Sequence, residues 1–239
     1  LLAAFIKNQL NASRVSENYL IEDYSDDSRI GIYYYEYGSY PRKPRVVYDR
    51  KHSSINNIEI SDVPQTLFYN TRLFHTSGIT LGLGGKAQDF AIHCIKEFKK
   101  QGTLISFDVN YRSNLWTGEE ARKCIETILP YVDIFFCSED TARLTFGKTG
   151  TINEIQKSFC EEYPISVVAS TERTVITPKK HNFTSIIYSA KNDTYYRENP
   201  YNNIDVVDRI GSGDAYVSGA LYGYLKHGDC QKALEYGNA

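Results

Sequence analysis

Short apolar runs alternate with segments of helical spacing along the chain after Pro64. The apolar runs are Leu73–His75, Leu104–Phe107 and Val132–Phe136. Each is followed by residues whose apolar positions recur every three or four, over Lys86–Lys100, Glu119–Leu129, Glu139–Phe146 and Ile152–Tyr163. Repeated strand-helix alternation predicts a parallel sheet with helices on both faces. We therefore expect a three-layer α/β protein with a mostly parallel central sheet.

The chain departs from this alternation near both ends. Gly31–Tyr37 and Arg45–Asp49 are short β runs joined by the turn residues Gly38–Pro41, which predicts a β-hairpin within residues 29–54. Its apolar residues occupy both faces, so we expect the hairpin to cover another part of the molecule.

The segment after residue 164 is expected to form an antiparallel edge of the sheet, followed by helices. The predicted strands are Ile165–Ala169, Thr174–Ile176 and Ser185–Tyr188. The predicted helices are Gly213–Leu225 and a last one that begins near Asp229.

Composition excludes several classes of protein. The 239 residues are 41% hydrophobic and 23% charged, and 27 basic minus 29 acidic residues gives a net charge of −2, which argues against a nucleic-acid partner. No apolar run approaches the roughly 20 residues of a membrane span. The five cysteines are widely spaced, which favours reduced thiols over disulfides or zinc. We expect a soluble, cytoplasmic protein.

The sequence contains no Met, and it opens with apolar residues of helical character at Leu1–Ile6. We expect residues 1–239 to be a single α/β domain that is truncated at both ends.

Two glycine-bearing stretches imitate phosphate-binding loops. Gly82–Ala87 fits G-x-G-x-x-A and is followed by Asp108, but Ser77–Leu81 separate it from the preceding strand, which a dinucleotide fingerprint should follow directly. Ala142–Thr149 resembles a P-loop, but its helical character and single glycine indicate a helix that ends at Gly147.

A third stretch, Asp208–Gly219, fits phosphate chemistry better. Gly211 and Gly213 allow a sharp turn whose backbone N–H groups lie at the head of a helix, where the dipole favours negative charge. Asp214 could accept a proton from an attacking hydroxyl, or it could simply stabilise the helix N-terminus. The local pattern favours neither.

Asp208–Ala215 resembles the D-x-x-G-x-G-D-A signature of the ribokinase-like sugar kinase family. Three further stretches resemble the 2-keto-3-deoxygluconate kinases of that family in order and spacing. They are Ser77–Thr80, Phe107–Arg112 with Leu115–Trp116, and Ser138–Ala142. With the hairpin residues, the resemblance covers nearly the whole chain.

The resemblance implies a ribokinase-like fold with a small β lid, and transfer of the ATP γ-phosphate to the terminal hydroxyl of 2-keto-3-deoxygluconate. Mg²⁺ would shield the phosphates. Asp214 would be the catalytic base, and the backbone amides of Gly211, Ser212 and Gly213 would form the anion hole.

The resemblance also implies where the ligands bind. Arg50 and Arg112 would pair with the sugar carboxylate, although Arg112 could instead form an ion pair with Asp108. Tyr33 and Tyr48 would donate hydroxyls to the sugar, or they could simply pack in the hairpin. The nucleotide would be bound by Asn110, Ser138, Thr171, Arg173 and Asn238.

The sequence departs from the family in three ways. Residues 1–239 contain no counterpart of the family's N-terminal sugar-binding region, as expected if the chain is truncated there. Thr141 stands where the family has the glutamate that helps to organise Mg²⁺, so Glu139 or Asp140 compensates or the metal is held through water. The T-x-G-x-x-G nucleotide loop appears as Ser170–Thr174, without glycine.

Three alternative functions remain open on the sequence: a kinase for a neutral sugar such as fructose or ribose, a nicotinamide-dependent oxidoreductase built on Gly82–Ala87, and a non-catalytic sugar-binding relative. The expected partners are a small sugar acid and ATP, without nucleic acid or membrane. A homodimer formed through the hairpin is also expected from the resemblance.

Overall fold

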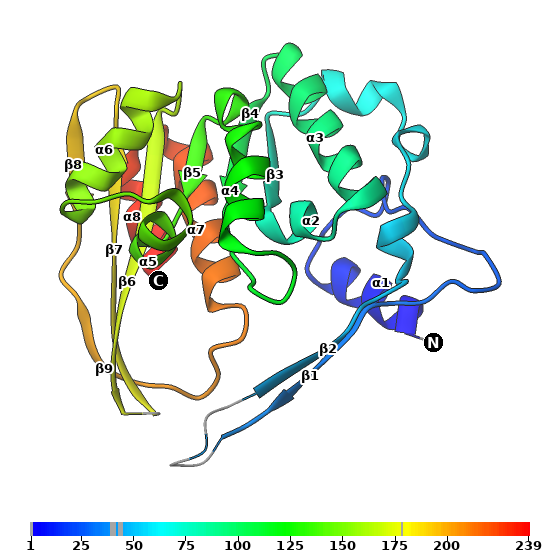
Figure 1. Ribbon diagram of the computed structural model, residues 1–239, viewed down its shortest axis with the longest axis horizontal. Helices are drawn as coiled ribbons and strands as arrows, with labels where there is room; N and C mark the ends of the chain where they lie inside the picture. Colours follow the sequence, from blue (N-terminus) through cyan, green and yellow to red (C-terminus); the bar gives the residue numbers. More distant parts are fainter. Residues whose placement is uncertain (1, 39–41, 43–44, 178) are drawn as a thin grey trace.

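A seven-stranded sheet forms the middle of the molecule (Figure 1) in the computed structural model, which describes residues 2–38, 42, 45–177 and 179–239. The strands are β3 (Leu73–Ser77), β4 (Leu104–Asp108), β5 (Ile134–Phe136), β6 (Val167–Thr177), β7 (Lys180–Ser189), β8 (Thr194–Arg197) and β9 (Tyr201–Asp205). Strands β3 to β6 are parallel neighbours, and β7 pairs antiparallel with β6, β8 and β9. The predicted parallel sheet with an antiparallel edge is confirmed.

The carboxyl ends of β3, β4 and β5 are level with one another, whereas β6 continues beyond them to Thr177. Ser77 pairs with Asp108, Asp108 with Phe136, and Phe136 with Ala169. Residues that follow these positions therefore gather at one edge of the sheet.

The antiparallel edge differs from the sequence prediction. Ile165–Ala169 and Thr174–Ile176 were expected to be separate strands, but β6 runs through both, because β7 pairs with its polar middle as well as its apolar ends. Strands β8 and β9 were not expected, since they are too polar to show an apolar pattern. Both pair with the outer edge of β7.

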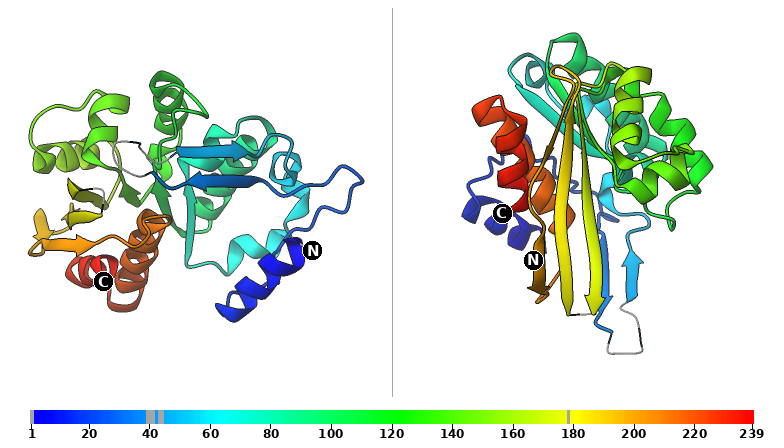
Figure 2. Two further views of the ribbon diagram at one scale, coloured as in Figure 1. Left: turned by 90° about the horizontal axis from the view of Figure 1, so that it is seen from below. Right: turned by 90° about the vertical axis from the view of Figure 1, so that its left-hand side faces the viewer.

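Helices cover both faces of the sheet, as predicted (Figure 2). The covering helices are α3 (Gly85–Lys100), α4 (Gly118–Glu126), α5 (Glu139–Phe146), α6 (Ile152–Glu162), α7 (Ser212–His227) and α8 (Cys230–Asn238). Helix α2 (Gly78–Gly82) follows β3 directly, and α1 (Leu2–Ala12) contributes no buried residue. One buried apolar cluster lies between the sheet and α3 to α6, and includes Ile95, Phe107, Phe135 and Phe159. A second lies between the other face and α7 and α8, around Phe136 and Tyr216.

Local signals explain several helix ends. Thr117 and Thr151 form capping boxes at the starts of α4 and α6. Helix α4 stops at Glu126 rather than at the expected Leu129, because Pro130 lacks the backbone N–H that would continue it.

Neither discounted glycine stretch adopts the geometry of a phosphate-binding loop. Gly82–Gly85 join α2 to α3, so they do not follow a strand. Gly147 ends α5 in the left-handed conformation at φ 66°, as expected for a helix C-cap.

The predicted hairpin forms a separate two-stranded sheet that projects from the body of the molecule (Figure 1). Strands β1 (Ile32–Glu36) and β2 (Arg45–Asp49) are antiparallel, with Tyr33 opposite Tyr48. Their expected turn, Gly38–Pro41, lies mostly outside the described residues. Three short 3₁₀ helices between residues 54 and 69 lead from the hairpin to β3. No helix in the described part of the chain is long and apolar enough to cross a membrane.

Candidate active site

A cavity of about 220 Å³ lies where the carboxyl ends of β4 and β5 and the neighbouring part of β6 meet the N-terminus of α7. We call it the strand-end cavity. Its lining includes Asp108, Asn110, Arg112, Cys137, Ser138, Thr141, Thr171, Gly213 and Tyr216. Open α/β sheets bind ligands at this edge, because the loops that leave parallel strands converge there.

The glycine-bearing loop enters α7 through a sharp turn. Gly211 is the N-cap residue at φ 75°, and its carbonyl accepts a hydrogen bond from the Ala215 amide at 2.8 Å. The Ser212 amide donates to the Arg209 carbonyl at 3.2 Å, so of the three proposed anion-hole amides this one is already engaged. Gly213 faces the strand-end cavity. The first-turn amides lack intrahelical acceptors, and the helix dipole makes this end attractive to anions.

Asp214 is the third residue of α7 and is exposed to solvent. Its negative charge acts on Asp108 at the end of β4, where it helps to raise the pKa of that carboxyl group. The two carboxylates are therefore close enough to repel one another. Their sequence positions are more than a hundred residues apart, so only the fold brings them together.

Asp108 is an acid that sequence reasoning noticed without assigning it a role in the site. Burial is the main cause that raises its pKa to about 6, and Asp214 adds to the effect. The Asn110 amide, which donates to Asp108 Oδ1 at 3.0 Å, and the charge of Arg112 both oppose the rise. Its position directly after the predicted strand Leu104–Phe107 was the signal that could have identified it.

Asn110 and Arg112 lie in the turn that follows β4. Asn110 has a positive φ of 37°, and the hydrogen bond from its amide to Asp108 supports this conformation. Arg112 Nη1 donates to the Tyr111 carbonyl at 3.0 Å. Nη1 also donates to the Asn110 carbonyl at 3.5 Å. These bonds hold the guanidinium at the wall of the cavity and leave Nε and Nη2 to face a ligand.

Ser138 and Thr171 lie across the cavity from the α7 loop. Ser138 caps α5: its Oγ accepts from the Thr141 amide at 3.2 Å and donates to Thr141 Oγ1 at 2.8 Å. Glu139 forms an ion pair with Arg143, with Oε1 2.5 Å from Nη2. Of the two acids that could compensate for Thr141, Glu139 is therefore engaged elsewhere, and Thr141 itself lines the cavity.

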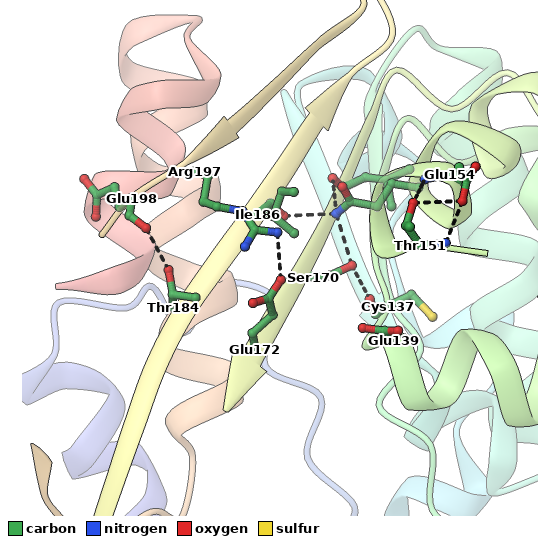
Figure 3. Close-up of polar contacts among 12 residues, drawn as sticks. Cys137, Glu139, Thr151, Glu154, Ser170, Glu172, Thr184, Ile186, Arg197 and Glu198 are labelled. Carbon is green, nitrogen blue, oxygen red and sulfur yellow. Dashed lines mark hydrogen bonds and ion pairs between the residues drawn. The ribbon is translucent and has the colours of Figure 1, made fainter. Parts of the chain in front are cut away.

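Arg173 and Asn238 are not among the residues that line the strand-end cavity. Arg173 lies on β6 opposite Phe183, and its pKa is lowered by burial and by the charge of Arg209. Asn238 accepts a hydrogen bond from Ser185 at 2.6 Å and donates to Glu198 at 3.0 Å. Both Ser185 and Glu198 belong to the antiparallel edge of the sheet, part of which Figure 3 shows.

A second cavity, of about 380 Å³, lies between the hairpin and α2. We call it the hairpin cavity. It is lined by Tyr33, Tyr48 and Arg50 on one side and by Ile79 and Leu83 on the other. The two tyrosine rings are 6.3 Å apart between centroids.

Arg50 lines the hairpin cavity and also contacts the segment that carries Arg112. Its guanidinium lies 4.3 Å from the centre of the Tyr48 ring, and Nη2 donates to Asn114 Oδ1 at 3.4 Å. Burial lowers the pKa of Arg50, Tyr48 opposes the change, and the positive charge of Arg112 adds to it. The two arginines therefore repel one another. Asn114 was not identified from the sequence, and nothing in its local pattern distinguishes it.

The whole chain, residues 1–239, matches the family model of pfkB family carbohydrate kinases. The chain belongs to this family. It is 29% identical over 216 residues to a 2-dehydro-3-deoxygalactonokinase from Haloferax volcanii, an alignment that covers 90% of this chain and 64% of that protein. The chain thus spans somewhat less than two thirds of the length of this relative.

Two solved structures show the same pfkB family architecture. A pfkB family carbohydrate kinase from Listeria grayi superposes with a TM-score of 0.89 at 29% identity, over 99% of this chain and 73% of that one. A 2-dehydro-3-deoxygluconokinase from Thermotoga maritima gives a TM-score of 0.81 at 31% identity, over 87% and 65%. The predicted ribokinase-like fold class is confirmed.

The donor set of this pfkB family site suits a hydrated magnesium ion better than a transition metal. No group of three His, Cys, Asp or Glu side chains gathers as a metal site in the described ranges. Asp108 and the Thr141 hydroxyl offer hard oxygen atoms in the strand-end cavity. Mg²⁺ usually keeps several waters and takes its other ligands from phosphates, so this sparse oxygen set fits it.

Proposed function

We propose that this protein transfers the γ-phosphate of ATP to the terminal hydroxyl of 2-keto-3-deoxygluconate or a closely related keto-deoxy sugar acid. The observation that carries the proposal is the approach of Arg50 and Arg112, from the hairpin and the β4 turn, beside two tyrosines. Arg50 lines the hairpin cavity and Arg112 lines the strand-end cavity, and the two cations repel one another. A carboxylate bound between them would neutralise both. The names of the Haloferax and Thermotoga relatives support the same substrate class.

In the proposed reaction, Asp214 accepts the proton of the terminal hydroxyl. The freed oxygen forms a bond to the γ-phosphorus, the bond from that phosphorus to the bridging oxygen breaks, and ADP leaves. The N-terminus of α7 and the Gly213 amide stabilise the negative charge of the phosphoryl group. Tyr33 and Tyr48 donate hydroxyls to the sugar.

The strand-end cavity is the proposed nucleotide side of the site. Asn110, Ser138 and Thr171 face it and are proposed to contact the phosphates, while Arg173 and Asn238 are proposed to lie nearer the base. Asp108 and Thr141 would contact Mg²⁺, directly or through its waters. When bound, the ion would offset phosphate charge during transfer.

The role of Asp214 is tested by Asp214→Asn. The variant keeps a polar residue in the first turn but cannot accept the proton, so we expect kcat to fall by about 10²- to 10⁴-fold. Asp229→Asn is the matched control, because Asp229 caps α8 and lines neither cavity, and asparagine caps equally well. If Asp214→Asn has the same kcat as the parent, Asp214 is not the base of the reaction.

The substrate class is tested with Arg50→Ala and Arg112→Ala. Loss of a charged hydrogen bond to a carboxylate should raise KM for 2-keto-3-deoxygluconate by about 10- to 100-fold, with a much smaller change for ATP. Arg45→Ala is the control, because Arg45 lies on β2, the strand that Arg50 follows, but outside the hairpin cavity. Equal losses for both substrates, or better turnover of fructose or ribose than of the sugar acid, would favour the neutral-sugar alternative.

We extend the proposal to the assembly and the compartment. The hairpin is proposed to pair with the hairpin of a second copy, because Tyr34 and Val47 are exposed on it. A cytoplasmic location is proposed because all five cysteines are free.

A further inference from the structure

A short chain of buried side-chain hydrogen bonds links helix α6 to the wall of the strand-end cavity. It runs from Gln156 on α6 through Ser170 on β6 to the carbonyl of Cys137, which follows β5 (Figure 3). Cys137 precedes Ser138, so the chain ends next to a residue that we propose contacts the nucleotide.

Gln156 is an unusual residue for its position. Its side chain is completely buried, and Nε2 donates to Ser170 Oγ at 3.1 Å and to the Ile186 carbonyl at 3.0 Å. Its Oε1 has no hydrogen-bond partner among the described residues. Burying an unpaired amide oxygen costs about 1–3 kcal/mol, so an apolar residue would be the more stable choice for packing alone. The donor function of the amide is therefore the property that distinguishes this side chain.

The hydrogen bonds of Ser170 have a fixed direction. The Gln156 NH₂ group can only donate, so Ser170 Oγ accepts from it, and the single hydroxyl proton of Ser170 is donated to the Cys137 carbonyl at 2.7 Å. The hydrogen bond that Gln156 donates to Oγ thus orients the Ser170 hydroxyl toward the Cys137 carbonyl. Ser170 is itself only 3% exposed, so water does not compete freely for these bonds.

The Cys137 carbonyl needs this donor because the β5–β6 ladder ends there. The last paired residues are Phe136 and Ala169, and the Cys137 amide makes a final bond to the Ala169 carbonyl at 3.0 Å. Beyond that point the chain turns into α5. The Ser170 hydroxyl thus fixes the peptide between Cys137 and Ser138, and with it the start of α5 and the hydroxyls of Ser138 and Thr141.

We propose that Gln156 and Ser170 are positioning residues for the nucleotide side of the site. They hold the Cys137–Ser138 peptide so that the start of α5 presents its hydroxyls to the triphosphate, while neither residue needs to touch the ligand. This inference rests on the proposed function, in which the strand-end cavity takes ATP. Among the described residues, no side-chain hydrogen bond of Gln156 or Ser170 reaches the hairpin cavity on the proposed sugar side.

The test compares Ser170→Ala with Ser170→Thr in the full chain. Ser170→Ala removes the donor to Cys137, and we expect KM for MgATP and the dissociation constant of a non-hydrolysable ATP analogue to rise about three- to tenfold. KM for the sugar acid should change less than twofold. Ser170→Thr keeps the hydroxyl and should restore nucleotide affinity. Gln156→Leu should raise the same two constants by a smaller factor, because the Ser170 hydroxyl keeps its proton but is no longer oriented by Gln156.

The control is Ser189→Ala, which removes a buried serine from the neighbouring strand β7, three register positions from Ser170 and outside the lining of the strand-end cavity. A purely structural role would lower the melting temperature of Ser170→Ala and Ser189→Ala alike and leave nucleotide affinity unchanged in both, and this result would overturn the proposal. If the parent phosphorylates no sugar acid but Ser170→Ala still binds the ATP analogue more weakly, the substrate proposal fails while the positioning role stands. If the parent phosphorylates the sugar acid and Ser170→Ala binds the analogue as the parent does, the positioning role fails alone.

Discussion

At the residue scale, Asp108 shows how the candidate site uses a charge that folding alone would not favour. Its carboxylate is held at the end of β4 beside a second acid, and burial raises its pKa to about 6. The Asn110 amide partly compensates by donating to it. Strongly perturbed carboxyl groups in cavities are typical of functional sites, where ligand chemistry outweighs stability.

The raised pKa of Asp108 makes stability depend on pH. An unfolded aspartate has a pKa near 3.9, so between about pH 4 and pH 6 the folded state binds more protons than the unfolded state. The contribution of Asp108 to the free energy of unfolding therefore falls as pH rises through this range.

We predict that Asp108→Asn stabilises the ligand-free protein by about 1–3 kcal/mol at pH 7.5 and by much less at pH 4. The asparagine oxygen can still accept the Asn110 hydrogen bond, so only the charge is lost. Urea denaturation at both pH values measures the difference. Asp27→Asn, in an exposed loop, serves as the control, and an unchanged pH dependence in Asp108→Asn would contradict the prediction.

At the element scale, two glycines allow α7 and α8 to pack in close contact. A Cβ atom on Gly219 would lie 2.2 Å from the Tyr236 carbonyl oxygen, and one on Gly223 would lie 2.5 Å from the Lys232 carbonyl oxygen. The sequence predicts the α7 helix from its apolar residues, although glycine weakens a helix by about 1 kcal/mol relative to alanine. Close packing of the two backbones explains why glycine is present.

We predict that Gly219→Ala lowers the free energy of unfolding by about 1–3 kcal/mol, since the added methyl group would force the two helices apart. Gly118→Ala is the matched control. It begins α4, and a Cβ there would be 3.7 Å from its nearest neighbour, which is an ordinary contact. Urea denaturation of the two variants against the parent measures the effect, and equal midpoints for both would show that α7 and α8 adjust without cost.

At the scale of the whole molecule, the hairpin is a separate sheet that projects away from the central sheet (Figure 1). Tyr33 and Tyr48 face the hairpin cavity, whereas Tyr34 and Val47, which pair with each other on the opposite face, are 57% and 39% exposed. A two-stranded sheet with apolar residues on both faces is stabilised by a second contact on its outer face.

We predict that Val47→Lys weakens a homodimer formed through the hairpins, because it places a charge on the exposed outer face that carries Tyr34 and Val47. Sedimentation equilibrium over a concentration series measures the change in association. Val175→Lys is the control, since Val175 is a similarly exposed valine on β6, outside the hairpin. If both variants associate as the parent does, or if the parent is monomeric, the hairpin is not a dimer interface.

Sequence reasoning predicted the elements well wherever burial imposes a regular pattern. The strands at residues 73, 104 and 134 and the helices that follow them are buried on at least one face, so their apolar residues recur with the period of the element. It failed for β8 and β9 and for the polar middle of β6, where pairing with β7 rather than burial stabilises the strand.

The candidate site was predictable only in part, for a related reason. Asp214, Arg50 and Arg112 belong to local motifs that a resemblance can identify. Asn114 and the Gln156–Ser170 chain carry no local pattern, because their roles depend on contacts with residues far away in the sequence.

The sequence by itself determined the three-layer α/β class, the hairpin and the helix that begins at the glycine-bearing loop, and its resemblance to a family indicated the residues that we propose for phosphoryl transfer. Only the tertiary structure decided which of these residues meet. It set Asp108 within reach of the charge of Asp214, directed Arg50 toward the segment of Arg112, and ended the Gln156–Ser170 chain at the carbonyl before Ser138. The physical reason is that element patterns arise from neighbours three or four residues away, whereas charge pairs and buried hydrogen bonds form between side chains that the sheet register brings together.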